Sequence, residues 1–298
     1  MKTNLLKQMR SKVIAIVGPT ASGKTAYAIE LAKKIDGEII SADSRYVYRE
    51  LNIGTAKPTI EEMSVIPHHL IDIVNPDFDY SVGLFVKDAK KCIDEIINRG
   101  KIPIVAGGTG LYFTALFENY LLPEAEPDWK LREELDKFSS EDLWEILLEL
   151  DCNAPELINL DKNDKKKIIR TIEILKLTGK KMEDIRTKGE CPYDVEWIGL
   201  NFEREELYNR INLRTDEMIN SGLVEETKNL INKWGRLHNI TDTIGYREIT
   251  EYLDGEISLN QAVDKIKQNS RRYAKRQLTW FRRNPQIKWN IYPHALAK

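Results

Sequence analysis

Apolar and polar positions follow a repeating pattern through the first 119 residues of the chain. Short runs of apolar residues end at glycine or at a polar residue, and stretches with helical spacing lie between them. The runs predict strands at 13–17, 38–42, 69–74 and 102–106, and the spacing predicts helices at 25–34 and 81–98. The strand runs are continuously apolar, as in strands buried on both faces of a parallel sheet. The alternation therefore predicts an α/β fold.

The pattern changes after residue 119 and changes back near residue 191. Residues 120–190 are charged, mostly helical in spacing and interrupted by prolines, and they show no strand pattern. Residues 197–202 then read as a strand that returns to the sheet, followed by a helix at 203–220 and a helical remainder. We therefore predict an α/β core beginning at 1–119, a helical insertion at 120–190, and a return strand with C-terminal helices at 191–298.

Composition limits the class of protein. The chain has 298 residues, of which 42% are hydrophobic, enough for a large packed core. Its three cysteines are far apart with no paired spacing, which fits a reducing compartment and no structural zinc. No apolar stretch has the length of a membrane span, and no signal peptide is evident. We expect a soluble, cytoplasmic protein with no membrane partner, and a monomer by default.

The charge of the chain is unevenly distributed. The formal net charge is −2, yet residues 265–283 carry eight basic side chains and no acidic one. Without these eight, 37 basic residues remain against 47 acidic ones. A near-neutral total thus hides a basic segment on an acidic body, and such a segment is a candidate surface for a polyanion.

A phosphate-binding motif follows the first predicted strand. Residues 18–25, GPTASGKT, match the pattern GxxxxGK[ST] between a strand and a helix, the context in which the motif forms a phosphate loop. Backbone amides and the helix N-terminus attract phosphate oxygens, and Lys24 adds a full charge. The hydroxyl of Thr25 can bind a magnesium ion that bridges phosphates. The fold predicted is thus a P-loop NTPase-like parallel sheet covered by helices, and the motif is silent on which phosphate compound is bound.

Two further segments end predicted strands at the same edge of the sheet. Asp43 follows the second strand, where parallel α/β sheets place their ligands. Its carboxylate can accept a proton or assist a metal, or it can simply cap the turn that follows. Thr109, in the sequence GGTG after the fourth strand, offers a hydroxyl, although the glycines alone could mark only a turn.

Together these segments resemble the tRNA dimethylallyltransferase (tRNA isopentenyltransferase, or IPP transferase) family in its bacterial form. The resemblance is ordered along nearly the whole chain. It rests on GPTASGKT (18–25), SADSRYVYRELNIGTAKP (41–58), HHLIDI (68–73), PIVAGGTGLYF (103–113), NDKKKIIR (163–170), TIGYRE (243–248) and YAKRQLTWFRR (273–283).

The resemblance implies a reaction and its partners. Family members move a dimethylallyl group from dimethylallyl diphosphate to the exocyclic amine of the adenosine 3′ to the anticodon of tRNA, and diphosphate leaves. The phosphate loop would then hold a prenyl diphosphate with Mg²⁺ as cofactor. The tRNA anticodon stem-loop would be the second substrate, with its target base splayed out of the stack.

The resemblance also implies roles for individual residues. Asp43 corresponds to the general base and Thr109 to a residue near the reacting groups. Diphosphate binding would fall to Gly18, Thr20, Ala21, Ser22, Gly23, Lys24, Thr25, Arg210 and Arg214, with Thr25 also on the metal. Contacts to tRNA would fall to Asp43, Ser44, Arg45, Tyr46, Thr109, Lys130, Lys166, Lys167, Arg170, Gly245, Tyr246, Arg247, Arg271, Arg272 and Arg276.

Two positions depart from the family pattern. Lys167 stands where an arginine is usual, and lysine keeps the charge but loses the bidentate fork. Tyr46 stands where glutamine is frequent, so stacking could replace a hydrogen bond. In the basic segment, Tyr273, Trp280 and Phe281 could stack on bases, although aromatic residues at helical spacing more often lie in a core.

Two other classes of protein share part of this pattern. A kinase or other P-loop nucleoside triphosphatase would explain the phosphate loop, but beyond Asp43 no clear apolar run ends in the Asp or Asp-Glu typical of a hydrolysing Walker B motif. A non-catalytic RNA-binding protein would explain the basic segment, but it would not need Lys24 together with Asp43. The test between the three is whether the protein turns over a prenyl diphosphate, ATP or neither.

Overall fold

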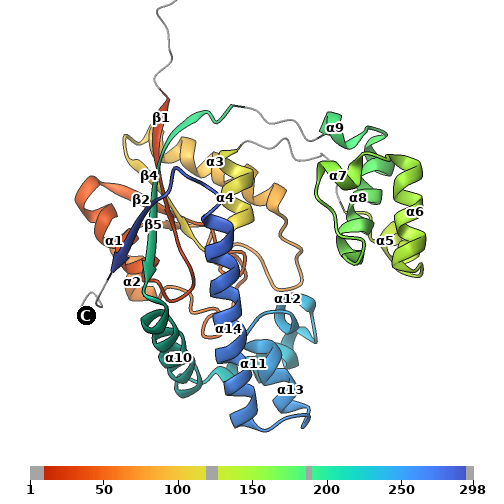
Figure 1. The fold of residues 1–298 in the computed structure, drawn as a ribbon. Coiled ribbons are helices and arrows are strands. Elements are labelled where there is room, and N and C mark those ends of the chain that lie inside the picture. The colour runs from red at the N-terminus through yellow and green to blue at the C-terminus, as the bar shows by residue number, and fades with distance from the viewer. Residues whose placement is uncertain (1–9, 119–126, 186–189, 293–298) are drawn as a thin grey trace, which may run out of the picture. The chain divides into compact units, whose positions relative to one another are not determined.

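The structure is a computed structural model that describes residues 10–118, 127–185 and 190–292 (Figure 1). Its chain divides into two compact units. The first comprises Met1–Leu116 together with Pro192–Lys298, and the second is Phe117–Cys191. The sequence placed the insertion at 120–190, within three residues of these boundaries.

The first unit is built on one parallel sheet. Its strands are β1 (Ser11–Val17), β2 (Gly37–Ser41), β3 (His68–His69), β4 (Ile102–Gly107), β5 (Tyr193–Phe202) and β6 (Lys288–Tyr292). They lie in the order β3-β2-β4-β1-β5-β6, and every pair is parallel. The α/β fold with a parallel sheet, predicted from the sequence, is confirmed.

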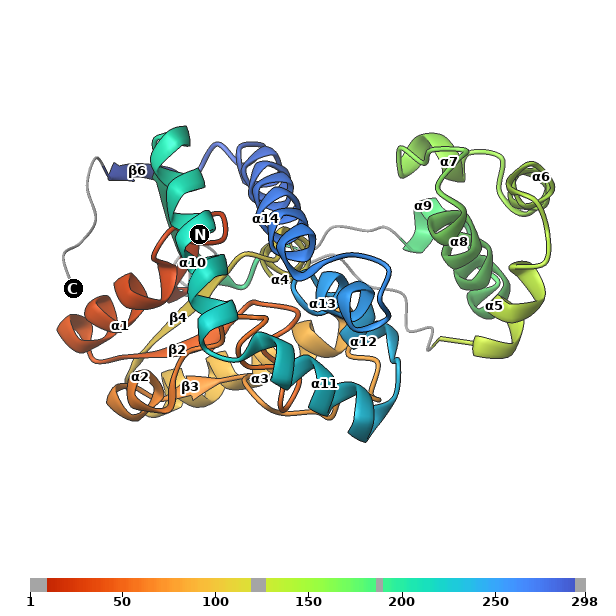
Figure 2. The ribbon, with the colours of Figure 1, turned by 90° about the horizontal axis from the view of Figure 1, so that it is seen from below.

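Both faces of this sheet are covered. Side chains alternate along β1, so Ile14 and Ile16 point to one face while Val13 and Val17 point to the other. All four are at most 4% exposed. Ile14 and Ile16 share a core cluster with Ile29 of α1, and α1 and α3 lie on opposite sides of the sheet (Figures 1 and 2). Continuous apolar runs in the sequence follow directly from this double burial.

Helices complete the first unit. Those near the sheet are α1 (Lys24–Ile35), α2 (Ile60–Val65), α3 (Val82–Asn98), α4 (Gly110–Phe117) and α10 (Arg204–Asn220). The C-terminal part adds α11 (Leu223–Trp234), α12 (His238–Thr241), α13 (Tyr246–Leu253) and the long α14 (Leu259–Phe281). A second core cluster joins α11, α13 and the N-terminal half of α14 to the segment after β2, with Tyr246 fully buried in it.

One strand prediction and one helix prediction were wrong. The strand expected at 69–74 is only His68–His69, because Leu70 and Asp72 adopt positive φ angles of 63° and 55° that take the chain out of the extended conformation. The remainder of the chain, expected to be helical, also contains β6, which pairs with β5. A short edge strand of this kind depends on a neighbour far away in the sequence.

The second unit is helical and has its own core. It contains α5 (Trp129–Leu135), α6 (Ser140–Leu150), α7 (Ala154–Leu157), α8 (Lys165–Thr178) and α9 (Met182–Ile185). Within it, α5 and α6 pack against α8 (Figure 2), and Leu147 and Ile172 are fully buried. Glu173, also fully buried, accepts hydrogen bonds from Arg132 at 2.9 Å and from the Asp128 amide at 2.7 Å.

In the part of the chain that the structure describes, no helix combines the length and apolarity that a membrane crossing requires.

Candidate active site

The phosphate loop lies at the carboxyl end of β1 and leads into α1. The loop turns tightly, with the Ser22 amide donating to the Pro19 carbonyl at 3.3 Å. Its first residue cannot carry a side chain, because a Cβ at Gly18 would lie 2.4 Å from the Leu200 carbonyl oxygen of β5. The loop is thus held between β1 and β5 with residues 20–25 facing a cleft of about 970 Å³.

Asp43 and Thr109 meet at the same edge of the sheet. The Ala42 amide donates to the Ala106 carbonyl at 2.8 Å, and the Thr109 amide donates to the Ala42 carbonyl at 3.2 Å. The Thr109 hydroxyl accepts from the Ser44 amide at 3.1 Å. These bonds join the ends of β2 and β4, and Asp43 lines the same cleft as Lys24. The sequence predicted that Asp43 and the phosphate loop share one crevice, and both line this cleft.

Asp43 caps a turn and also borders the cleft. One carboxylate oxygen accepts from the Arg45 amide at 2.9 Å, which caps the turn after β2. The same side chain borders the cleft, so the turn also fixes the carboxylate's direction. Arg45 in turn reaches the Asn239 side chain of α12 at 3.4 Å, which ties this turn to the C-terminal helices.

The environment of Lys24 disfavours its charge. The ammonium donates to the Pro19 carbonyl at 2.6 Å, so in this state it folds back on its own loop. Burial lowers the pKa of Lys24 to about 7; the Asp43 carboxylate opposes this shift, and the Arg214 guanidinium adds to it. An arriving diphosphate would restore the charge, because an opposite charge nearby raises the pKa of an ammonium.

Two arginines of α10 contact the phosphate loop, near which the resemblance had placed them. The Nε of Arg210 donates to the Ala21 carbonyl at 3.0 Å, and its guanidinium lies 4.4 Å from the centre of the Phe202 ring. Arg214 donates to the Thr20 hydroxyl at 3.1 Å and to the Ala56 carbonyl at 3.2 Å. Both guanidinium groups therefore border the space above the loop.

Tyr46 is held by its hydroxyl rather than left to stack freely. The hydroxyl donates to the Ala56 carbonyl at 2.8 Å. Burial raises the pKa of Tyr46 to about 12, partly opposed by Arg214, so the phenol remains neutral. Ala56 thus accepts hydrogen bonds from both Tyr46 and Arg214, which fixes the segment after β2 over the cleft.

The basic segment forms the long helix α14, and its charges point in different directions. Arg272 and Arg276, four residues apart, line the cleft. Tyr273 lies between them in the sequence, and its hydroxyl is near that of Thr109. Burial raises the pKa of Tyr273 to about 12, with a smaller contribution from the Asp43 carboxylate. The cleft face of α14 thus carries both basic and hydrogen-bonding groups.

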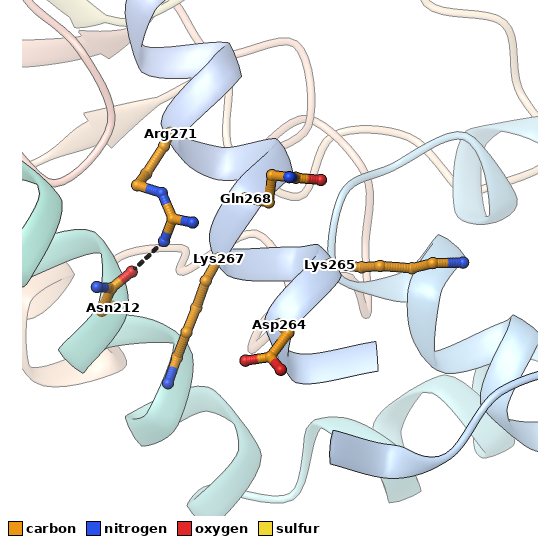
Figure 3. A pocket seen from close by; sticks show the side chains of 6 residues that line it. All are labelled: Asn212, Asp264, Lys265, Lys267, Gln268 and Arg271. Atoms are coloured by element: carbon orange, nitrogen blue, oxygen red, sulfur yellow. Dashed lines mark hydrogen bonds between the residues drawn. The ribbon is translucent and has the colours of Figure 1, made fainter. Parts of the chain in front are cut away.

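Three other basic side chains of α14, outside the cleft, have partners on α10 and α13. Arg271 donates to the Asn212 side chain at 2.7 Å across a shallow hollow of about 400 Å³ (Figure 3). Lys265 and Lys267 form ion pairs with Glu251 and Asp216, at 2.8 and 2.6 Å. This hollow therefore offers less net positive charge to a polyanion than the sequence suggested.

The other predicted aromatic contacts divide between core and surface. Phe281 is 2% exposed and packs edge-on against Phe113. Trp280 is 37% exposed, and its indole nitrogen donates to the Thr114 hydroxyl at 3.1 Å. The core role weighed from the sequence fits Phe281, while Trp280 anchors α14 to α4 and keeps an exposed edge.

The three residues of the Gly245–Arg247 segment differ in their access to the cleft. Arg247 lines the cleft and pairs with Glu248. Gly245 precedes α13, and its amide donates to Glu248 at 2.8 Å. Tyr246, expected to contact tRNA, is instead fully buried with its hydroxyl on Glu226 at 2.6 Å. Its side chain supports the surrounding loop and is not accessible to RNA.

The predicted tRNA contacts of the helical insertion lie in the second unit. Lys130 and Lys166 are exposed. Lys167 is exposed and pairs with Asp164 at 2.7 Å, and Arg170 pairs with the buried Glu173. The structure describes this unit by itself, and the contact of these residues with tRNA stays a prediction.

Magnesium fits the cleft only as an ion shared with phosphate. Among the described residues, no three His, Cys, Asp or Glu side chains gather closely enough to hold a metal. The cleft offers the Thr25 hydroxyl and the Asp43 carboxylate. Mg²⁺ commonly binds through one or two protein oxygens together with substrate phosphates and water. This donor set therefore fits an ion that arrives with the diphosphate, held by Thr25.

Sequence reasoning missed Gln277 and the role of Tyr273. Gln277 lies in the basic segment, whose recognisable signals are its charge and its aromatic residues, and a single amide gives no such signal. Tyr273 was considered only as a stacking residue. Each contacts a loop more than 160 residues earlier in the chain. The four-residue spacing of Gln277 and Tyr273 was the one available sign that they share a helix face.

Comparison with known proteins places this chain in a family. Residues 46–284 match the family model described as IPP transferase, and residues 11–72 match the model described as isopentenyl transferase. A tRNA dimethylallyltransferase of Alkaliphilus oremlandii is 48% identical over 94% of this chain and 91% of its own length. That of Halalkalibacterium halodurans is 45% identical over the same shares.

Solved structures agree. The tRNA isopentenylpyrophosphate transferase of Bacillus halodurans is 43% identical, with a TM-score of 0.72 over 95% of this chain and 90% of its own. A eukaryotic dimethylallyltransferase acting on tRNA is 29% identical, with a TM-score of 0.81 over 94% of this chain and 74% of its own. The resemblance found in the sequence is thereby confirmed, and the chain belongs to the IPP transferase family, the tRNA dimethylallyltransferases, which transfer a dimethylallyl group to tRNA.

Proposed function

We propose that this cleft transfers the dimethylallyl group of dimethylallyl diphosphate to the exocyclic amine of the adenosine 3′ to the anticodon. One observation carries the proposal: Asp43 and the phosphate loop with Lys24 line a single cleft. A carboxylate that accepts a proton and a cradle that accepts diphosphate are the two groups this reaction needs in one place.

The donor binds over the phosphate loop. Backbone amides of the loop and the start of α1 attract the diphosphate oxygens. Lys24, Arg210 and Arg214 surround the same space and neutralise charge on the departing group. A magnesium ion held by Thr25 would add neutralisation when bound with the diphosphate.

The acceptor amine lies between the diphosphate and Asp43. As the allylic carbon–oxygen bond breaks, the carbon–nitrogen bond forms, and the leaving electron pair stays on diphosphate. Asp43 orients the amine and takes its proton as the bond forms. The Thr109 hydroxyl, which accepts a hydrogen bond from the Ser44 amide, lies near Asp43 at the same edge of the sheet.

The tRNA contacts the cleft through its splayed loop. Arg272 and Arg276 of α14 and Arg247 of α13 line the opening, where phosphates of the anticodon loop would lie. Lys130, Lys166, Lys167 and Arg170 of the second unit supply further basic groups. Ser44, Arg45 and Tyr46 border the adenosine itself.

The test is mass analysis of an unmodified anticodon stem-loop incubated with the protein, magnesium and dimethylallyl diphosphate. We expect one dimethylallyl addition at the adenosine 3′ to the anticodon and release of one diphosphate. A parallel incubation with ATP should give no phosphate release. Turnover of ATP without modification of the RNA would instead indicate a kinase or nucleoside triphosphatase.

Charge reversal on α14 should separate its two faces. We expect Arg272→Glu with Arg276→Glu to weaken stem-loop binding and to lower the slope of log affinity against log salt by about 2, roughly 1 for each phosphate that the variant no longer neutralises. Arg271→Glu is the control, because Arg271 faces Asn212 rather than the cleft. Binding is measured by fluorescence anisotropy at several salt concentrations, and equal slopes for all three proteins would contradict the assignment.

Donor binding should take up a proton above neutral pH. The pKa of Lys24 is about 7 without ligand, so at pH 8 most molecules carry a neutral lysine. Diphosphate raises that pKa, and binding therefore becomes weaker as pH rises through 7. We expect uptake approaching one proton at pH 8 and almost none at pH 6.

Calorimetry with dimethylallyl diphosphate, without tRNA, in buffers of different ionisation enthalpy measures this uptake. Lys24→Arg is the control, because arginine stays charged and its uptake reports only the ligand's own titration. Equal uptake by both proteins would show that Lys24 does not titrate on binding.

A further inference from the structure

Gln277 makes two hydrogen bonds to backbone groups that border the cleft. It lies in α14 and is only 5% exposed. Its side-chain nitrogen donates to the Gly108 carbonyl at 2.9 Å, and its side-chain oxygen accepts from the Thr20 amide at 2.8 Å. The two partners are of opposite type, so only one orientation of the amide satisfies both.

Each partner of Gln277 belongs to a different part of the site. Thr20 lies in the phosphate loop, and its hydroxyl accepts from Arg214. Gly108 directly precedes Thr109, which contacts Ser44 and Tyr273. One amide therefore spans the gap between the group that holds the donor and the group beside Asp43.

The fit around this amide is close. A Cβ at Gly108 would lie 2.2 Å from the Gln277 side-chain nitrogen, so glycine is needed there for the amide to approach the carbonyl. Buried amides with both groups paired are costly to disturb, because removal of one leaves a buried backbone group without a partner. The geometry is thus specific to the pair Gly108 and Gln277.

The helix that carries Gln277 has other anchors nearby. Trp280 donates to the Thr114 hydroxyl at 3.1 Å, and Phe281 packs on Phe113 with ring centres 5.7 Å apart. Loss of the Gln277 amide should therefore leave α14 in place and free only the two loops. A local effect of this kind can be measured apart from folding.

We propose that Gln277 is a positioning residue for the transfer reaction, whose amide sets the spacing between the phosphate loop and the Thr109 turn. The inference rests on the proposed function, because it concerns the distance between the bound diphosphate and the amine beside Asp43. Reactions between bound groups are sensitive to that distance, and a displacement of about 1 Å can cost about 100-fold in rate.

The first test is Gln277→Met in the full chain, which keeps the volume and removes both hydrogen bonds. We expect kcat at saturating donor and stem-loop to fall about 10–100-fold, while stem-loop affinity changes little and the unfolding temperature falls by only a few degrees. The control is Gln268→Met. Gln268 lies on the same helix, at the shallow hollow between α14 and α10 (Figure 3), so this change should leave kcat unchanged.

The second test is Gln277→Glu, read as a pH profile. The ionised carboxylate can accept from the Thr20 amide but cannot donate to the Gly108 carbonyl, and it places negative charge beside the diphosphate. The protonated carboxyl group can do both. We therefore expect the kcat of this variant, relative to the unmodified protein, to rise as pH falls, a trend that a packing role alone would not produce.

The third test joins Gly108→Ala with Gln277→Ala. Gly108→Ala alone should lower kcat because its methyl group meets the amide. In a protein that already carries Gln277→Ala, which removes the amide, Gly108→Ala should lower kcat much less. Full additivity of the two losses would mean that the two residues do not act together.

Three results would overturn the inference. The first is Gln277→Met with the kcat of the unmodified protein. The second is a loss confined to stem-loop affinity, which would make Gln277 an RNA contact. The third is a flat relative pH profile for Gln277→Glu. If the unmodified protein itself fails to modify the stem-loop, the proposed function fails first and the inference falls with it.

Discussion

Asp43→Ala is expected to lower kcat for prenyl transfer by about 10²–10⁴-fold, the usual contribution of a general base. The reason is positional, since Asp43 is the carboxylate at the end of β2 that borders the cleft beside Lys24. Stem-loop binding should be nearly unchanged, because its basic contacts lie on other elements. Single-turnover transfer of a radiolabelled dimethylallyl group, together with anisotropy for binding, measures both quantities.

Asp43→Asn is the matched control for Asp43→Ala. Its amide oxygen can still accept from the Arg45 amide, so the turn after β2 should keep its shape. We expect it to lose transfer as fully as alanine does, because an amide does not accept the amine's proton. Wild-type kcat in Asp43→Asn would show that the carboxylate acts only as a turn cap. Parallel loss of transfer and RNA binding would favour a scaffold that binds RNA without catalysis.

Lys24→Ala should lower kcat/KM for dimethylallyl diphosphate by about 10²–10³-fold, the magnitude typical when one preorganised charge-stabilising group is removed. Lys24 sits at the start of α1, within the field of Asp43 and Arg214, where a departing diphosphate would accumulate charge. Lys33→Ala is the control. It lies on the same helix but pairs with Glu30 at an exposed position. Calorimetric affinity for the donor should fall for Lys24→Ala alone, and equal affinity in both variants would exclude Lys24 from the donor site.

The fold was predictable where structure is decided locally. Strands such as β1 are continuously apolar because both faces are covered, and helices such as α3 have one apolar face. The strand expected at 69–74 failed because positive φ angles at Leu70 and Asp72 are set by contacts with the segment after β2. Lys57, for instance, pairs with Asp72 at 2.5 Å. The strand β6 was missed because its neighbour in the sheet, β5, lies about 90 residues earlier.

The site was predictable where a motif carries its own geometry. The phosphate loop and Asp43 follow strands whose carboxyl ends share one edge of the sheet, so their meeting follows from topology. Partners from other elements were not visible. The sequence counted Lys265, Lys267 and Arg271 as available charges, and only the structure shows Glu251, Asp216 and Asn212 beside them. The resemblance implied that Tyr246 contacts tRNA, whereas in the structure it is buried in a core cluster that includes residues of α11.

The Ala56 carbonyl has a consequence for how donor preference can change. This one oxygen accepts hydrogen bonds from Tyr46, which we propose borders the adenosine, and from Arg214, which contacts the phosphate loop. A backbone atom cannot be exchanged by substitution, so any shift of the chain at Ala56 disturbs the grip on both substrates together. We therefore expect that substitutions which let the protein accept a bulkier isoprenoid fall at other residues that line the cleft, such as Leu213 or Met218. Neither residue takes part in the hydrogen bonds at Ala56.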